Sequence, residues 1–322
     1  MMAKRFGFGE YVYELDVDWG RLPEGWSYVD AVGMVVDSQD RVYVFNRGAH
    51  PIIVFDRNGT LLGTWGEGIF PVPHGLQVGP DGSIYCVDCG NHTLRKFTPE
   101  GKLLLMIGMP GKKSDTGYDG DPDRIRPAGP FNAPTNCAIA ADGSIFVTDG
   151  YGNCRVHHFS ADGKLLHSWG EPGVGPGQFR LVHGIGIAGD GTLYVGDRIN
   201  NRVQKFSPSG EYVGEWSDVR RPDEIFAHSN GHFFVAELGW PDEELTPASV
   251  GARVTIRNAE GHILSGWDDG GAPGAPGNIA APHGITVDSH GDLYVGEVAN
   301  ATRISTGLLK TCHVVQKFIR VH

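Results

Sequence analysis

The chain of 322 residues has little positive charge and no long hydrophobic run. It contains 27 lysines and arginines against 38 aspartates and glutamates, for a formal net charge of −11. This balance argues against nucleic acid or an anionic membrane as a partner. No apolar stretch approaches the roughly 18 residues that a membrane-spanning helix needs, so we expect no membrane span. Residues 1–7 lack the apolar segment of a signal peptide, and a cytoplasmic location is the expectation.

Cysteine is also scarce, with five in the whole chain: Cys86, Cys89, Cys137, Cys154 and Cys312. An odd number leaves at least one cysteine outside any disulfide within the chain. Cys86 and Cys89 form a C-x-x-C pattern, which in other settings serves redox chemistry or metal binding. Here the pattern lies on a strand-like run that enters a turn, where side chains three residues apart point to opposite faces. We therefore expect no shared role for this pair.

Glycine and proline are abundant, at 48 and 20 residues, which predicts many turns and few long helices. One sequence unit recurs along the chain: a D-G-like turn, an aromatic-valine strand, an acidic turn, a strand ending in phenylalanine, a glycine turn and a strand ending in Trp-Gly. Complete copies begin near Asp40, Asp81, Asp142 and Asp190, a degraded copy near Asn230, and a copy without its last strand near His290. We expect the recurrent carboxylates Asp88, Asp149 and Asp197 and the recurrent arginines Arg95, Arg155 and Arg202 to brace the turns.

Six such units predict an all-β fold, a six-bladed β-propeller that forms a single domain over residues 1–322. Isolated blades would expose hydrophobic faces, which stacking around an axis buries. The stretch Tyr11–Leu15 alternates like a strand and can complete the last blade, closing the ring between the two ends of the chain. The units resemble NHL repeats, as in the run DRINNRVQKF at residues 197–206. This resemblance implies the fold and says little about function.

Three copies of a histidine tripeptide stand before strand-like runs: Pro73-His74-Gly75, Val182-His183-Gly184 and Pro282-His283-Gly284. The first strand of each propeller blade lines the central channel, and these histidines open the second, fourth and sixth blades. Alternate blades of six lie about 120° apart, so the three side chains can converge. The matching places of other blades are assigned to Asn136 and Asp223, so the repeat itself does not require histidine.

Three histidines with an open fourth position are typical of a catalytic zinc site, and zinc is the predicted metal. The same ligands would also admit iron, cobalt or manganese. The alternative is that the three histidines are packed in the channel and bonded to the backbone or to water.

The ends of the second strands should share the channel mouth with these histidines. They place Arg47 in the first blade, Tyr151 in the third and Arg198 in the fourth. Two arginines beside a cation suit a small carboxylate, because the guanidinium offers a fixed fork for bidentate binding. A tyrosine in such surroundings can act as a base. The alternative is that the arginines pair with acidic loop residues.

This set of residues resembles the lyase half of the peptide-amidating enzymes, peptidyl-α-hydroxyglycine α-amidating lyase. The resemblance implies His74, His183 and His283 as zinc ligands. It also implies Tyr151 as the catalytic tyrosine, with Arg47 and Arg198 as channel arginines. The implied reaction splits an N-acyl-α-hydroxyglycine-like carbinolamide into an amide and glyoxylate. The implied partner is a small-molecule or peptide-terminal carboxylate substrate.

The chain also departs from that family. Gly284 stands where the family has a calcium-binding aspartate, so the sequence does not favour a structural Ca2+, although Met34 and Leu76 could still offer carbonyls. Gly152 replaces the cysteine that follows the family's tyrosine, and Cys154 lies two residues further on, so the family's disulfide pattern is not reproduced. Two other functions stay open: a non-catalytic NHL propeller that binds protein, and a metal-dependent hydrolase or lactonase on a related propeller.

Overall fold

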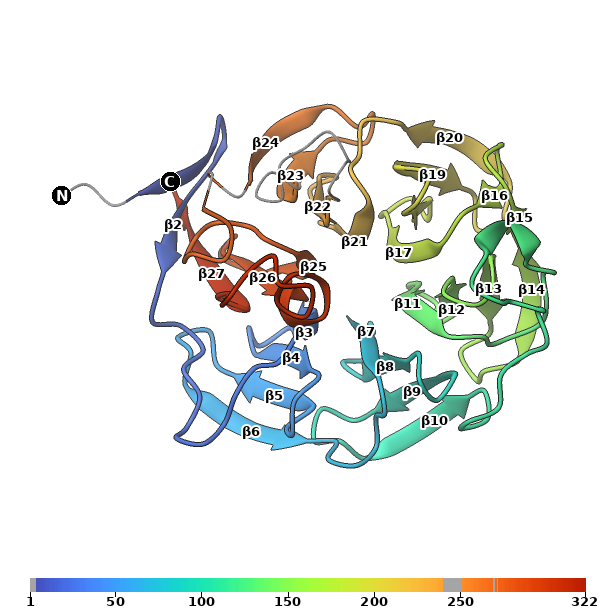
Figure 1. Ribbon diagram of the computed structural model, residues 1–322, viewed down its shortest axis with the longest axis horizontal. Helices are drawn as coiled ribbons and strands as arrows, with labels where there is room; N and C mark the ends of the chain where they lie inside the picture. The colour runs from blue at the N-terminus through green and yellow to red at the C-terminus, as the bar shows by residue number, and fades with distance from the viewer. Residues whose placement is uncertain (1–3, 240–250, 269, 271) are drawn as a thin grey trace. The chain divides into compact units, whose positions relative to one another are not determined.

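The computed structural model describes residues 4–239, 251–268, 270 and 272–322, and it confirms a nearly all-β, six-bladed β-propeller (Figure 1). Each blade is a sheet of antiparallel strands. The chain divides into two compact units, which are described in turn: a first unit of Met1–Trp65 with Phe226–His322, and a second unit of Gly66–Ile225. Whether residues 1–322 form a single domain stays a prediction. No helix in the described part of the chain is long and apolar enough to cross a membrane.

The second unit contains blades 2, 3 and 4, each with four strands in chain order. Blade 2 consists of β7 (Pro73–Val78), β8 (Ile84–Asp88), β9 (Thr93–Phe97) and β10 (Leu103–Ile107). Blade 3 consists of β11 (Pro134–Ile139), β12 (Ile145–Asp149), β13 (Arg155–Phe159) and β14 (Leu165–Trp169). Blade 4 consists of β17 (Val182–Ile187), β18 (Leu193–Asp197), β19 (Arg202–Phe206) and β20 (Tyr212–Trp216). Smaller elements are the 3-10 helix η1 (Pro122–Arg124) and the paired strands β15 (Glu171–Pro172) and β16 (Gln178–Phe179).

The first unit contains blades 1 and 6 and most of blade 5, since the division between the units falls inside β21. Blade 1 consists of β3 (Ala31–Val36), β4 (Val42–Asn46), β5 (Ile52–Phe55) and β6 (Leu61–Trp65). Blade 5 consists of β21 (Pro222–Ala227), β22 (Phe233–Glu237), β23 (Arg253–Arg257) and β24 (Ile263–Asp268). Blade 6 consists of β25 (Pro282–Val287), β26 (Leu293–Glu297), β27 (Val315–Val321), β2 (Tyr11–Asp16) and β1 (Arg5–Phe8). The π-helix η2 spans Asn300–Ile304.

The strand near the N-terminus completes blade 6, as the alternation of Tyr11–Leu15 predicts. β2 runs antiparallel to β27, with Tyr13 opposite Arg320 and Leu15 opposite Phe318. Tyr13 is fully buried, so this closure joins both ends of the chain into the core of the first unit. β1 adds a fifth strand on the outside of β2, which the repeat pattern did not predict.

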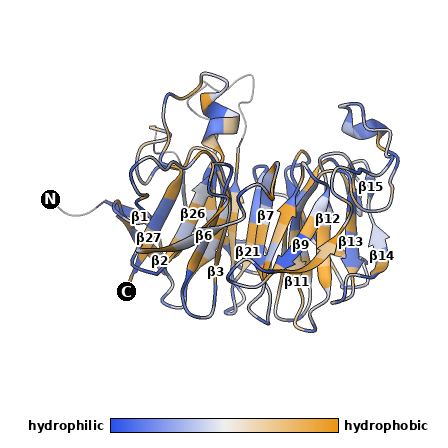
Figure 2. Ribbon diagram, turned by 90° about the horizontal axis from the view of Figure 1, so that it is seen from below, coloured by the Kyte–Doolittle hydropathy of each residue, from blue (hydrophilic) through white to orange (hydrophobic). Residues whose placement is uncertain are grey.

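The repeated turns and the central strands explain why each unit folds into blades. In blade 2 the D-G turn places Gly82 at φ 77°, a left-handed conformation that glycine adopts at no steric cost, and its N–H donates to the carbonyl of Gly79. The second strand of every blade is buried along its whole length, and the hydropathy of the strands can be followed in Figure 2. As predicted, outer-strand aromatics pack between blades: the ring of Trp169 lies 5.8 Å from that of Phe206.

The recurrent carboxylates brace turns, as expected from their place after the second strands. Asp88, Asp149 and Asp197 are fully buried. Asp149 accepts the backbone N–H of Asn132 at 2.9 Å, and Asp197 accepts that of Arg180 at 2.9 Å. Each carboxylate therefore ties the end of one strand to the loop that leads into its blade.

Arginines complete these braces in two of the three blades of the second unit. Arg202 contacts Asp197 at 2.8 Å, and Arg95 contacts Asp88 at 3.4 Å. Arg155 instead donates to backbone carbonyls at the end of its own sheet. All three arginines therefore have a structural role, as predicted. Arg95 and Arg202 hold a carboxylate, whereas the hydrogen bonds described for Arg155 go to backbone carbonyls.

None of the five cysteines forms a disulfide. Cys86 is buried in β8, and Cys89 follows that strand, half-buried, with its thiol directed at the carbonyl of Val72. The two members of the C-x-x-C pattern thus lie in different surroundings, as the strand periodicity predicts.

Candidate metal centre

A bulge at the start of each channel strand sets the direction of the three histidine side chains. The pairing of β7, β17 and β25 with the next strand shifts register directly after the first residue of the strand. A bulge of this kind bends the strand and re-aims a side chain. The histidine of each tripeptide is the second residue of its strand and lies in this bulge, and all three are buried: His74, His183 and His283.

Within the second unit, His74 and His183 lie beside each other and share Tyr151 as a neighbour. Their ring centroids are 4.8 Å apart. The Tyr151 hydroxyl lies 2.9 Å from Nε2 of His74 and 3.2 Å from Nε2 of His183. Both Nε2 atoms therefore face one oxygen, and that oxygen has a single hydrogen to donate. The arrangement suits a cation bound beside the tyrosine.

Backbone carbonyls fix the tautomer of both rings. Nδ1 of His74 lies 2.6 Å from the carbonyl oxygen of Thr135, and Nδ1 of His183 lies 2.8 Å from that of Asp223. A carbonyl oxygen only accepts hydrogen bonds, so each Nδ1 carries a proton, and in the neutral ring Nε2 has the lone pair. Histidines that bind metals commonly donate their second nitrogen in this way.

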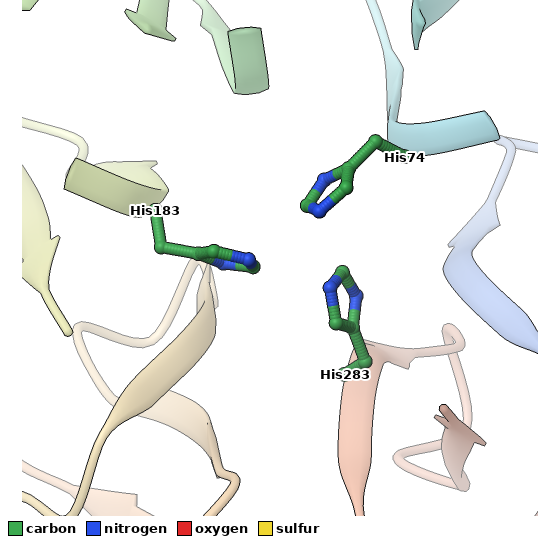
Figure 3. A group of neighbouring side chains, drawn as sticks. All are labelled: His74, His183 and His283. Atoms are coloured by element: carbon green, nitrogen blue, oxygen red, sulfur yellow. The ribbon is translucent and has the colours of Figure 1, made fainter. Parts of the chain in front are cut away.

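His283 follows the same rule in the first unit, where its Nδ1 donates to the carbonyl of Val32 at 2.6 Å. One possible ligand atom from each of His74, His183 and His283 lies within 4.8 Å of the others. Figure 3 shows the three rings turned toward one another. Three imidazoles that donate Nδ1 to the backbone leave Nε2 as the atom able to coordinate, a donor set that fits zinc and related divalent metals, so the residues present match the predicted ligand group.

The strand register corrects one of the assignments made for the other blades. The bulge of β11 falls between Pro134 and Asn136, so Thr135 occupies the histidine position in blade 3. The assignment of Asn136 was wrong by one residue, because the strand starts at its proline and the next residue enters the bulge. In blade 5 the second residue of β21 is Asp223, as predicted.

Arg198 lies against Tyr151 and against a buried carboxylate. Its Nη1 is 3.4 Å from the Tyr151 hydroxyl, and its Nε is 3.1 Å from Oδ1 of Asp223. Burial works against the charge of the guanidinium, but Asp223 and Tyr151 outweigh it and raise the pKa of Arg198. Arg198 therefore pairs with an acidic residue, as the alternative interpretation of the arginines predicts. The same guanidinium also contacts the Tyr151 hydroxyl.

Arg47 has a similar partner in the first unit. Its Nη1 lies 3.6 Å from Oδ2 of Asp30, and its backbone N–H donates to the carbonyl of the same residue. Asp30 is 1% exposed, and burial raises the pKa of its carboxyl while Arg47 opposes that shift. Both predicted channel arginines are thus held by a buried aspartate.

Gly284 has no space for the side chain that the resemblance would place there. A Cβ built on this residue would lie 2.8 Å from the backbone nitrogen of Met34, on the neighbouring strand β3. An aspartate at this position would require the two strands to move apart. That the chain binds no structural Ca2+ at this place stays a prediction.

One buried acid on a channel strand was missed by prediction from the sequence. Glu224 follows Asp223 in β21 and accepts a hydrogen bond from Nδ2 of Asn136 at 2.5 Å. Burial raises the pKa of Glu224 to about 8. A sequence signal was available, since the residue after the bulge position is glycine in all three histidine tripeptides, as in Gly75 and Gly184, but Glu224 in blade 5.

Comparisons with known proteins place the chain among propeller proteins. A family model described as NHL repeat matches residues 70–97. NHL repeat-containing protein 3 from Homo sapiens is 30% identical, over 70% of this chain and 67% of that protein. Peptidyl-glycine alpha-amidating monooxygenase B from Xenopus laevis is 29% identical, over 89% of this chain and 35% of that protein. Peptidyl-alpha-hydroxyglycine alpha-amidating lyase 1 from Drosophila melanogaster is 30% identical, over 74% of this chain and 45% of that protein.

The chain therefore spans about a third of the frog protein and less than half of the fly protein. Among solved structures, a gluconolactonase from Xanthomonas campestris superposes with a TM-score of 0.64. The match covers 97% of this chain and 91% of that one, at 12% sequence identity. At that identity the likeness concerns the fold alone.

Proposed function

This chain belongs to the NHL-repeat family of β-propeller proteins, and on that fold we propose that it acts as a metal-dependent carbon–nitrogen lyase. The substrate is an N-acyl-α-hydroxyglycine-like carbinolamide, and the products are an amide and glyoxylate. The observation that carries the proposal is the position of Tyr151, whose hydroxyl lies within 3.2 Å of the Nε2 atoms of both His74 and His183. The match to a fly protein named as an amidating lyase supports the same reaction class.

His74, His183 and His283 would hold the metal, for which zinc is the proposed choice. A divalent cation bound there supplies Lewis-acid polarisation of the substrate hydroxyl. The carbonyls that accept the Nδ1 protons fix the tautomer and the orientation of the imidazoles.

Tyr151 moves the proton. As a phenolate it takes the proton from the substrate α-hydroxyl, and the C–N bond then breaks as the hydroxyl carbon becomes the aldehyde of glyoxylate. The departing amide nitrogen receives the proton back from Tyr151, so no water is consumed and the tyrosine is regenerated. The Arg198 guanidinium, 3.4 Å away, stabilises the negative charge on the tyrosine oxygen.

Arg198 and Arg47 are proposed to bind the substrate carboxylate. Each is the first residue after a second strand, and each is oriented by a buried aspartate, Asp223 or Asp30. For Arg47, the role rests on this place in blade 1 and on the family resemblance. A planar guanidinium held on one edge presents the other edge in a defined direction, which suits a carboxylate.

The ligand assignment is tested with His183→Ala. The variant should lose most of its metal by elemental analysis, together with glyoxylate production from a simple N-acyl-α-hydroxyglycine. His167→Gln, a half-buried histidine of the same unit outside the centre, serves as the matched control and should keep both. Unchanged metal content in His183→Ala would rule out the ligand set. A metal-loaded wild-type protein that releases no glyoxylate would rule out the lyase.

The hydrolase or lactonase alternative makes a different product. A hydrolase acting on the same acyl-amide substrate consumes water and releases the free acid of the acyl group together with α-hydroxyglycine, which breaks down to ammonia and glyoxylate. The lyase instead releases the amide with glyoxylate, so the amide is the product that distinguishes the two reactions. Product analysis by mass spectrometry therefore separates the two reactions. A protein-binding propeller predicts that the purified chain holds no stoichiometric metal.

A further inference from the structure

The buried carboxylate of Asp223 stands at the position that carries a ligand histidine in three other blades. It is fully buried, and its contacts join the two functional groups of the second unit, His183 and Arg198. We propose that Asp223 is a positioning residue that holds the Arg198 guanidinium against Tyr151. The proposal rests on the lyase function proposed above.

The geometry separates Asp223 from the ligand set. Its Oδ1 lies 3.8 Å from Nδ1 of His183, on the side of the ring opposite to the coordinating Nε2. Nε2 of the same ring faces the Tyr151 hydroxyl at 3.2 Å. The carboxylate is therefore behind the histidine, and it does not approach the metal position from the side on which the Nε2 atoms meet.

Comparison with blade 3 shows that the carboxylate has a task of its own. Thr135 is likewise the second residue of its channel strand, and its carbonyl accepts Nδ1 of His74 just as the carbonyl of Asp223 accepts Nδ1 of His183. Orienting a ligand thus needs only the backbone of this position. The Thr135 hydroxyl bonds to Thr148 and to backbone carbonyls, and among the described residues it has no hydrogen bond to an arginine.

The arginine contact is what the aspartate adds. Oδ1 of Asp223 binds Nε of Arg198 at 3.1 Å, and Nη1 of the same guanidinium reaches the Tyr151 hydroxyl at 3.4 Å. Because the guanidinium is planar and rigid, holding Nε fixes where Nη1 can lie. Without the carboxylate, a buried cation would lose its counter-charge and would turn toward another acceptor.

The test is Asp223→Asn in the metal-loaded protein, which keeps the size of the side chain and removes its charge. We expect full metal stoichiometry and a kcat lowered about 10–100-fold, the range seen when outer-shell partners are removed. In an Arg198→Gln background the same change should cost less than about threefold, because residues acting through one contact are not additive. Asp88→Asn is the matched control: it removes another buried carboxylate that contacts an arginine, so it lowers stability and leaves kcat per bound metal unchanged.

A second readout does not depend on turnover. Glyoxylate binding to the metal-loaded protein, measured by calorimetry, should weaken about 10-fold or more in Asp223→Asn as Arg198 loses its orientation. Metal lost in proportion to activity, losses that add in the Arg198 background, or equal glyoxylate binding in wild type and variant would each overturn the proposal. If the wild type binds glyoxylate but turns over no substrate, and the variant binds it more weakly, the lyase fails and the positioning role stands.

Discussion

The two units use the same local devices but differ in the chemistry that they contribute. The second unit brings together two of the proposed ligand histidines, His74 and His183, with Tyr151 and Arg198, joined by direct contacts of 2.9 to 3.4 Å. The first unit supplies one ligand histidine, His283, and the Asp30–Arg47 pair. The acid–base part of the proposed mechanism therefore lies within one unit, and the other is proposed to contribute one metal ligand and one arginine that binds the substrate carboxylate.

The ends of the second strands show the same difference. In the second unit these positions carry Cys89, Tyr151 and Arg198, whereas blades 5 and 6 of the first unit carry Leu238 and Val298. Both of these apolar residues are buried. A repeated fold thus keeps its framework in every blade and varies single positions to set chemistry, which is how one propeller scaffold can host different functions.

The largest loss of activity should come from a change of Tyr151, in the second unit. Tyr151→Phe removes the proposed proton carrier and should lower kcat by about 10²–10⁴-fold, the usual contribution of a general acid–base group. Metal content should stay at the wild-type level, because the phenyl ring keeps its packing and the histidines are unchanged. The measurement is steady-state glyoxylate release at matched metal loading.

Two further variants, one in each unit, test whether the loss of activity is specific to Tyr151. Tyr118→Phe alters an exposed tyrosine of the same unit and should leave kcat unchanged. Arg47→Gln in the first unit should raise KM more than it lowers kcat, since its proposed task is to bind the carboxylate. A Tyr151→Phe protein that keeps more than about a tenth of wild-type kcat would remove the tyrosine from the mechanism.

The fold was predictable because its signals are local and repeated. Each D-G turn and each acidic turn marks a strand boundary by itself, and six copies reinforce one another. The closing strand could also be inferred, because Tyr11–Leu15 alternates and the last repeat lacks one strand. β1 was missed, since Arg5–Phe8 lies outside the repeat and pairs only because β2 leaves an open edge.

The candidate site was predictable where three blades agree and less so where one blade differs. The histidines stand out because the same tripeptide recurs at one place, and the structure brings them together. Asn136 was misplaced because the sequence does not show where a bulge begins. The contact between Glu224 and Asn136 spans 88 positions along the chain, so no local pattern indicates it.

Buried acids give a smaller effect that also differs between the units. Burial raises the pKa of Glu224 in the second unit to about 8 and that of Glu297 in the first unit to about 7. The folded protein keeps these protons at pH values where the unfolded chain, with ordinary glutamates near 4.5, has released them. The free energy of unfolding should therefore fall as pH rises from about 4.5 to 8, by a few kcal/mol for each of the two groups at about 1.4 kcal/mol per pKa unit.

Glu224→Gln should flatten this dependence, since an amide stays neutral across the whole window. Glu297→Gln should flatten it less, because the dependence there ends about one pH unit lower. Glu297→Gln should also cost stability at pH 5: its amide oxygen can still accept the backbone N–H groups of Ala280 and Ala281, but its amide nitrogen would face the Nε2 donor of Gln316. Urea unfolding at intervals between pH 5 and 8 measures both. Parallel wild-type and Glu224→Gln curves would contradict the buried, protonated state.

The smallest effect is expected from His158, on the outer strands of the second unit. Its ring stacks on Phe146 at 4.0 Å and 10°, and within the described residues neither ring nitrogen has a hydrogen-bond partner. Burial lowers the pKa of His158, and the neighbouring His167 lowers it further. The unfolded chain therefore binds more protons than the folded one below about pH 6.5, and the free energy of unfolding should fall as pH drops through that value.

His158→Phe keeps the ring stack and removes the two unsatisfied nitrogens, so it should raise the free energy of unfolding by about 1 kcal/mol at pH 7 and by more at pH 5. His262→Phe, an exposed histidine of the first unit, should change stability by less than about 0.5 kcal/mol at either pH. A His158→Phe protein that is less stable than wild type at pH 7, or that keeps the wild-type loss of stability below pH 6.5, would show that the outer strands of the second unit depend on this imidazole after all.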